Sequence, residues 1–307
     1  AAMILNGKAS PSRLEAEPTN SFQLYQVPFT GSQMLNDQEI KWIHHRAYLP
    51  EHLPDYVRAV SGAEPFLHRN YLYFMRKNHL IFNGYPLEPD SDPPARVYDS
   101  ICERCRPTTV ALIAPAIWLP AEQCEQQATD SYYRLDLPLP PLDPAVAYMV
   151  RRAHRELQAG QGSFGKEHKK IIKAFVAGHY FNPQQKYLYK HISHYLKASD
   201  RAVLLEARKE RDLAAFIIVD LGATDYAFYM FSFRSAKITV PGASDLLFHE
   251  MVKLSQAEGK KAINLCLGVN AGIRRFKEKW GGAPFLDYCS ALVDKREVDI
   301  GNLAKKL

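Results

Sequence analysis

The sequence predicts an α/β protein of the α+β type, in which helices flank a mixed central sheet. The first observation is a set of three apolar strand patterns joined by short polar turns, which is the spacing of an antiparallel meander. These strands are expected at residues 203–208, 213–221 and 226–233. The second observation is an alternation of helical and strand periodicities after the meander. Its helices are expected at residues 244–259 and 271–280, and its strands at residues 263–267 and 285–293.

The first half of the chain shows a similar order of elements. Its two hairpin strands, a helix, a strand, a short helix and a last strand are expected at residues 66–75, 79–85, 95–105, 108–114, 121–127 and 132–137. Three further helices are expected before the meander, at residues 145–157, 169–177 and 183–196. We therefore expect a flexible leader over residues 1–20, an N-terminal domain over 21–127 and a C-terminal domain over 128–307.

The composition is that of an ordinary globular protein. The 307 residues are 47% hydrophobic and 23% charged, with a formal net charge of +6 that suits phosphorylated ligands. No apolar stretch reaches the roughly 18 residues that a membrane-spanning helix needs, so we expect no span and a cytoplasmic protein. Five scattered cysteines fit no disulfide framework. Cys102 and Cys105 lack two further zinc ligands, so we expect half-buried helix thiols and no metal.

Four stretches of the second half carry a more specific signal. They are Val240–Leu247 (VPGASDLL), Gly259–Lys261 (GKK), Asn264–Leu265 (NL) and Gly272–Gly281 (GIRRFKEKWG). Together with the element order, they resemble the C-terminal domain of bacterial phosphatidylglycerol lysyltransferases, of FemABX-type peptidyltransferases and of their DUF2156 relatives. These families belong to the GNAT (N-acetyltransferase-like) superfamily. The resemblance is strongest over residues 200–290 and implies two GNAT-like domains in tandem, the first of them degenerate.

The resemblance implies an acyltransferase that moves an acyl group from acyl-CoA, or a similar carrier, to a small-molecule or peptide amine. The sequence departs from ordinary acetyltransferases, because Pro241-Gly242-Ala243 stands where they have a glycine-rich R/Q-x-x-G-x-G/A loop. Two alternatives stay open at this stage. One is a transferase that uses aminoacyl-tRNA as its donor, and the other is a ligand-binding protein without catalysis. The sequence leaves the acceptor, the acyl group and the oligomeric state open.

The predicted donor site combines a helix amino end with a basic helix. Val240, Gly242, Ala243 and Ser244 precede or begin a helix, where small residues let backbone N–H groups approach a phosphate and where Ser244 is the expected N-cap. Arg274 belongs to the basic helix that follows and is a second candidate for phosphate contact. A capped helix without a ligand fits the same residues.

The catalytic candidates are drawn from strands and from the basic helix. The related peptidyltransferases use a lysine in the last motif, and this resemblance implies that Lys277 contacts the reacting carbonyl or a carrier phosphate. Asn264 is a candidate to hydrogen-bond the acyl group. Glu206 and Tyr229 are the candidates for the general base, with His249 as an outsider. A solvated basic face, a structural asparagine and satisfied core residues are the respective alternatives.

Overall fold

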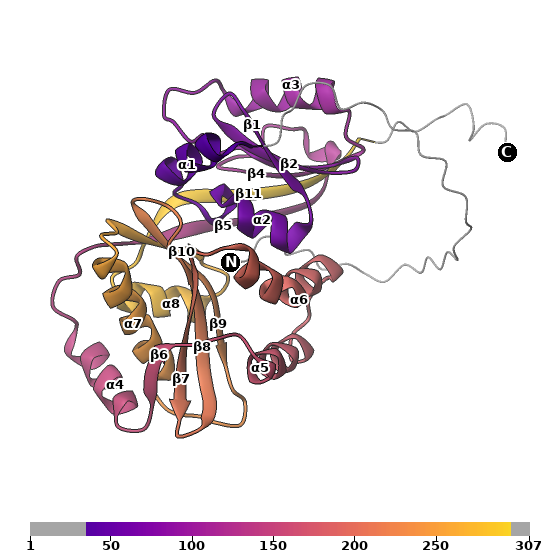
Figure 1. Ribbon diagram of the computed structural model, residues 1–307. Helices are drawn as coiled ribbons and strands as arrows, with labels where there is room; N and C mark the ends of the chain where they lie inside the picture. The colour runs from indigo at the N-terminus through magenta and orange to yellow at the C-terminus, as the bar shows by residue number, and fades with distance from the viewer. Residues whose placement is uncertain (1–34, 296–307) are drawn as a thin grey trace, which may run out of the picture.

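A computed structural model describes residues 35–295, which form one sheet of eleven strands (Figure 1). The strands are β1 (Glu64–His68), β2 (Tyr71–Arg76), β3 (His79–Asn83), β4 (Thr109–Ala114), β5 (Cys124–Asp136), β6 (Gln158–Gln161), β7 (Ala202–Lys209), β8 (Asp212–Asp220), β9 (Tyr226–Arg234), β10 (Ala262–Leu267) and β11 (Ala283–Asp294). Their order across the sheet is β1-β2-β3-β4-β11-β5-β10-β9-β8-β7-β6. The leader expected at residues 1–20 lies outside the described residues.

The two halves of the sheet have a similar arrangement of strands on either side of its middle. Each of them includes one central strand from the other half of the chain. β11, from the end of the described chain, pairs with β4, whereas β5, from the first half, pairs with β10. β5 and β11 pair with each other in a long antiparallel ladder. The parallel pairs β3/β4 and β9/β10 occupy equivalent positions in the two halves. The domain boundary expected at 127/128 falls within β5 and stays a prediction.

Eight α-helices, found among residues 35–295, cover the two faces of this sheet (Figure 1). They are α1 (Asp37–Arg46), α2 (Pro54–Ser61), α3 (Pro94–Cys105), α4 (Pro144–His154), α5 (Lys166–Ala177), α6 (Pro183–Ala198), α7 (Ala243–Ala257) and α8 (Ala271–Lys279). Apolar residues of α4 and α7 share one core cluster, and those of α1, α2, α5 and α6 share another. α3 packs with β1–β4 in a third cluster. None of these helices combines the length and apolar character that crossing a bilayer requires.

Most expected elements of the second half are confirmed, because their patterns are strong and local. The meander is β7–β9, and the alternation after it is α7, β10, α8 and β11. Cys102 and Cys105 lie on α3 as free thiols, the first buried and the second partly exposed. Two short elements, α2 and β6, were not expected from the sequence.

Two expectations in the first half are wrong. Residues 121–127 form only a 3-10 turn, Ala121–Gln123, because the chain from Cys124 onward pairs with β11 as a strand. Residues 66–75 are not one strand, since the chain reverses at Arg69 and Asn70, which adopt φ values of 48° and 67°. Such left-handed pairs form tight hairpin turns, so β1 and β2 are separate strands.

Candidate active site

β9 and β10 part in the middle of the sheet. They pair in parallel only from Tyr226 opposite Ala262 to Phe228 opposite Asn264, although β9 continues to Arg234. The register of β9 against β8 shifts beside Tyr229, and that of β10 against β5 shifts between Asn264 and Leu267. Such bulges bend a strand, so the two strands diverge where both bulge. Within the described chain, the edge of β9 beyond Phe228 is left without a strand partner on this side.

Asn264 holds the bulge of β10. Its Oδ1 accepts a hydrogen bond from the backbone N of Cys266 at 2.7 Å, and its Nδ2 donates to the backbone O of Tyr48 at 2.8 Å. Cys266 adopts a φ of 61°, which is costly for a side-chain-bearing residue unless its surroundings hold it. The side chain of Asn264 is fully buried and both its polar groups are bonded, so the observed role is structural.

Lys277 supports the same bulge from α8. Its Nζ donates to the carbonyl oxygens of Cys266 at 3.1 Å and Leu267 at 2.6 Å, and the residue is 2% exposed. Burial lowers the pKa of this lysine to about 8. The solvated-face alternative is therefore wrong for Lys277, and the predicted contact with a donor stays a prediction. Ile273, on the same helix, is exposed and does not join the core.

The amino end of α7 lies against α4. Gly242, not Ser244, is its N-cap, with a φ of 83°, so the expected capping role of Ser244 is wrong. A Cβ on Gly242 would come within 2.4 Å of the Met149 carbonyl oxygen of α4, so this approach requires glycine. Val240 and Ala243 are buried beside it, whereas Ser244 is half-exposed.

The first turn of α7 already contains an anion. The buried carboxylate of Asp245 accepts from Trp280 Nε1 at 2.9 Å and pairs with Lys279 Nζ at 2.5 Å. A carboxylate in this position is stabilised by the helix dipole, and Lys279 balances its charge. Arg274, in the first turn of α8, lies instead beside Asp130 of β5, with 3.8 Å between Nη1 and Oδ1.

Glu206 belongs to a charged network on the α5 face of the sheet. His168 is 1% exposed. Its Nδ1 accepts a hydrogen bond from the backbone N of Gly165 at 3.1 Å, so the hydrogen of the imidazole is on Nε2. Nε2 donates a hydrogen bond to Glu206 Oε2, also at 3.1 Å. The other carboxylate oxygen accepts from Arg208 Nε at 2.7 Å. Burial lowers the pKa of His168, although Glu206 opposes that shift. A Cβ on Gly162 would come within 2.4 Å of the Glu206 carboxyl carbon.

A hollow of about 280 Å³ lies next to this network. It is lined by Gln161 at the end of β6, by loop residues 162–164, by Ala202 and Leu204 of β7, and by Ser193, Leu196 and Lys197 of α6. Gly162 forms part of its wall and lies against the Glu206 carboxylate. None of the lining residues belongs to β9 or β10, so the hollow lies beside β7 and α6 and not at the opening between those strands.

Tyr229 lies on the opposite face of the sheet. Its ring packs edge-to-face on Phe248 of α7, with 5.5 Å between centroids, whereas Glu206 bonds to His168 of α5. α5 and α7 contribute to the separate core clusters on the two faces. The sheet thus separates the two candidates for the general base. Burial raises the pKa of Tyr229 to about 12, so its hydroxyl stays protonated at neutral pH.

Sequence reasoning missed His168, Cys266 and Gly162. His168 stands three residues after Gly165, in the position of a capping box, and this is a local signal. Nothing in the apolar pattern of residues 262–267 signals the left-handed backbone of Cys266. The role of Gly162 depends on Glu206, which is distant in the sequence and becomes its neighbour only in the folded sheet.

At the level of sequence, no family model and no curated protein matches the chain. Solved structures do match its fold. One is the C-terminal domain (DUF2156) of a protein described as a lysylphosphatidylglycerol synthetase from Agrobacterium fabrum. It has a TM-score of 0.55 and 14% identity and covers 83% of this chain and 92% of its own.

FemX has a TM-score of 0.57 with 9% identity, over 85% of this chain and 97% of its own. A tandem GNAT protein from the clavulanic acid biosynthesis pathway has a TM-score of 0.52 with 11% identity, over 87% and 98%. The chain has the tandem GNAT fold. These likenesses, together with the mixed sheet and its flanking helices, confirm the expected fold class and the expected resemblance. The parted strands β9 and β10 are the feature of this GNAT sheet on which the candidate site depends.

Replacing Lys277 by Met is expected to remove a pH-dependent part of the stability. The folded-state pKa of about 8 lies below the ordinary 10.5, so the unfolded chain binds more protons between these values. The free energy of unfolding should therefore rise by about 1 to 2 kcal/mol between pH 8 and 9.5 in the native sequence, and less in Lys277→Met. Urea unfolding at both pH values measures this. The exposed Lys261→Met is the control, and equal slopes in all three proteins would contradict the assignment.

Replacing Gly162 by Ala is expected to destabilise the fold by about 1–3 kcal/mol, because the new methyl group overlaps the Glu206 carboxylate. In a Glu206→Ala background the same change should cost much less, which a double-mutant cycle measures by urea unfolding. Gly160→Ala is the matched control, since nothing lies within 4 Å of a Cβ there. Additive effects of the two substitutions would show that the contact is absent.

Proposed function

We propose that this GNAT-fold chain is an acyltransferase that moves an acyl group from acyl-CoA, or a similar thioester carrier, to an amine. The observation that supports this is the unpaired inner edge of β9 beyond Phe228, where β10 turns away. The amide groups of a pantetheine arm can pair with such an edge as an added strand does. The amino end of α7 follows β9 in the chain and offers backbone N–H groups to the carrier phosphates.

The charge at the amino end of α7 permits this donor. Asp245 would repel a phosphate, but its carboxylate is paired with Lys279, so the pair has no net charge. Ser244, in the first turn, is half-exposed, and Pro241 just before the helix is exposed. The helix therefore begins at the surface, where a phosphate can reach it. The path of the chain into α7 is fixed by Val240, Gly242 and Ala243. Arg274 of α8 stays a proposed phosphate contact.

Tyr229 is the proposed acid of the reaction. Acyl transfer breaks the carbon–sulfur bond of the thioester while the amine forms a bond to the carbonyl carbon. The leaving thiolate takes a proton from the Tyr229 hydroxyl, and the resulting tyrosinate takes the proton that the attacking nitrogen loses, so the hydroxyl is restored. Tyr229 carries a proton at neutral pH and lies on the strand that would bind the donor. Lys277 and Asn264 act through the bulge of β10, which shapes the opening. Glu206, on the other face, is proposed as a base only for an acceptor bound on the α5 side.

Replacing Ser244 by Glu is expected to weaken binding of acetyl-CoA about tenfold, because a second, unbalanced carboxylate then faces the donor phosphates. The substitution favours the helix itself, since an acidic residue in the first turn suits the helix dipole, so the fold is retained. Calorimetric titration with acetyl-CoA and longer acyl-CoAs measures the effect.

Gln184→Glu is the matched control for this titration. It adds the same charge at the equivalent position in the first turn of α6, where Asn182 is the N-cap. Its affinity for acyl-CoA should equal that of the native sequence. Absence of binding to any acyl-CoA at millimolar concentration, or equal loss in both variants, would overturn the proposal.

Exposed lysines favour a second candidate, a transferase that uses aminoacyl-tRNA as donor. On α5 and α6 these are Lys166, Lys169, Lys170, Lys173, Lys186, Lys190 and Lys197. Such a surface attracts phosphates in a salt-dependent manner. This candidate requires that tRNA be retained at low salt and released as salt rises, and that Lys169→Glu weaken retention while Ser244→Glu does not.

A further inference from the structure

α4 and α7 are in close contact along the face that carries the aromatic side chains of Tyr229 and Phe248. Val150 and Ala153 of α4 share a core cluster with α7. The missing side chain of Gly242 lets the Met149 carbonyl oxygen approach α7. The two helices therefore have a fixed relative position.

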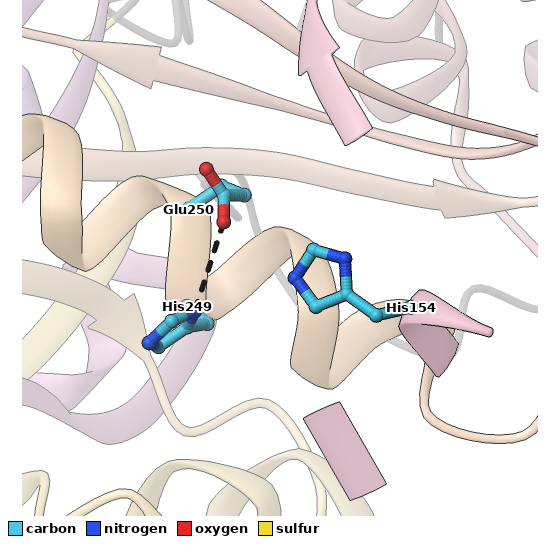
Figure 2. A group of neighbouring side chains, drawn as sticks. All are labelled: His154, His249 and Glu250. Carbon is cyan, nitrogen blue, oxygen red and sulfur yellow. Dashed lines mark ion pairs between the residues drawn. The ribbon is translucent and has the colours of Figure 1, made fainter. Parts of the chain in front are cut away.

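Three potential metal ligands meet at this contact. His154 is the last residue of α4, and His249 and Glu250 are neighbours on α7. Figure 2 shows the two imidazoles and the carboxylate facing a common space, and one ligand atom from each lies within 4.8 Å of the others.

His249 carries the observation that points to a ligand. Its Nδ1 is buried and has no hydrogen-bond partner among the described residues. Glu250 Oε1 is an ion-pair partner 3.7 Å away, beyond hydrogen-bond distance (Figure 2). A buried polar atom without a partner is destabilising, so such atoms usually have a bonding role.

The donor set suits zinc. Two imidazoles and one carboxylate, with water in the fourth position, form a tetrahedral zinc site with bonds of about 2.0 Å, so ligand atoms lie about 3.3 Å apart. Zinc binding requires the ligand atoms to move closer than their present spacing of up to 4.8 Å, and the exposed His154 has room to turn. Lys253, which pairs with Glu250 at 3.1 Å, is 59% exposed and can turn away.

We propose that His154, His249 and Glu250 bind one Zn²⁺ ion, which clamps α4 against α7. The proposal does not rest on acyl transfer, because none of the three ligands belongs to β9 or to the amino end of α7. It also differs from the expectation of no metal, which rested on the lack of further ligands close in sequence to Cys102 and Cys105. The ligands escaped that search because they come from two helices far apart in the sequence.

Calorimetric titration of the metal-stripped, untagged protein with zinc chloride tests the site. The native sequence is expected to show one site with a dissociation constant of micromolar or below, weakened at least tenfold in His249→Asn. His45→Asn, which changes an exposed histidine of α1, is the matched control and should bind zinc as the native sequence does. Equal binding by the native sequence and His249→Asn would overturn the site.

The melting temperature tests the clamp. At free zinc near a hundred times the dissociation constant, the native sequence should melt about 5 °C higher, and His249→Asn should not shift. If His249→Asn does not fold, Glu250→Gln is the second variant, because its neutral amide is a poorer zinc ligand. Circular dichroism shows whether each variant is folded. Zinc binding without any rise in melting temperature would remove the clamp and leave only a bound ion.

Discussion

The exchange of central strands between the two halves is the constraint on which the rest of the structure depends. β10 is held along one edge by β5, which comes from the first half of the chain. Because that edge is secured, β10 needs only three residue pairs with β9 on its other side. A strand held on one edge can turn away from its other neighbour without loss of the fold. The opening between β9 and β10 is therefore a consequence of how the halves are joined.

Two buried polar side chains keep the bend of β10 in place from opposite directions. Asn264 bonds to the backbone within the bulge and to Tyr48 of the first half, while Lys277 bonds to two carbonyl groups at the end of the strand. Losing either would leave buried backbone groups unpaired, at a cost of about 1–3 kcal/mol each. Their place in the motifs that suggested an acyltransferase thus has a structural explanation that needs no substrate contact.

The sequence was informative where structure is set by nearby residues. The meander, α7 and α8 follow from apolar periodicity and glycine stops, and the motifs around Val240 and Lys277 indicated the fold. Residues 121–127 were misjudged because pairing with β11 decides their conformation, and those partners are distant in the sequence. The candidate site was less predictable. The separation of Glu206 from Tyr229 depends on which helix covers each face, and the burial of Lys277 on how α8 is turned.

The shared sheet also determines how the chain can be made and divided. β4 must wait for β11, so the first half remains with an open edge until nearly all the described chain has left the ribosome. Such long-range pairing slows folding and leaves an edge that can pair with other chains. The first half expressed alone would lack β11 and would present the open edge of β4 permanently. The first half is therefore not a self-sufficient folding unit.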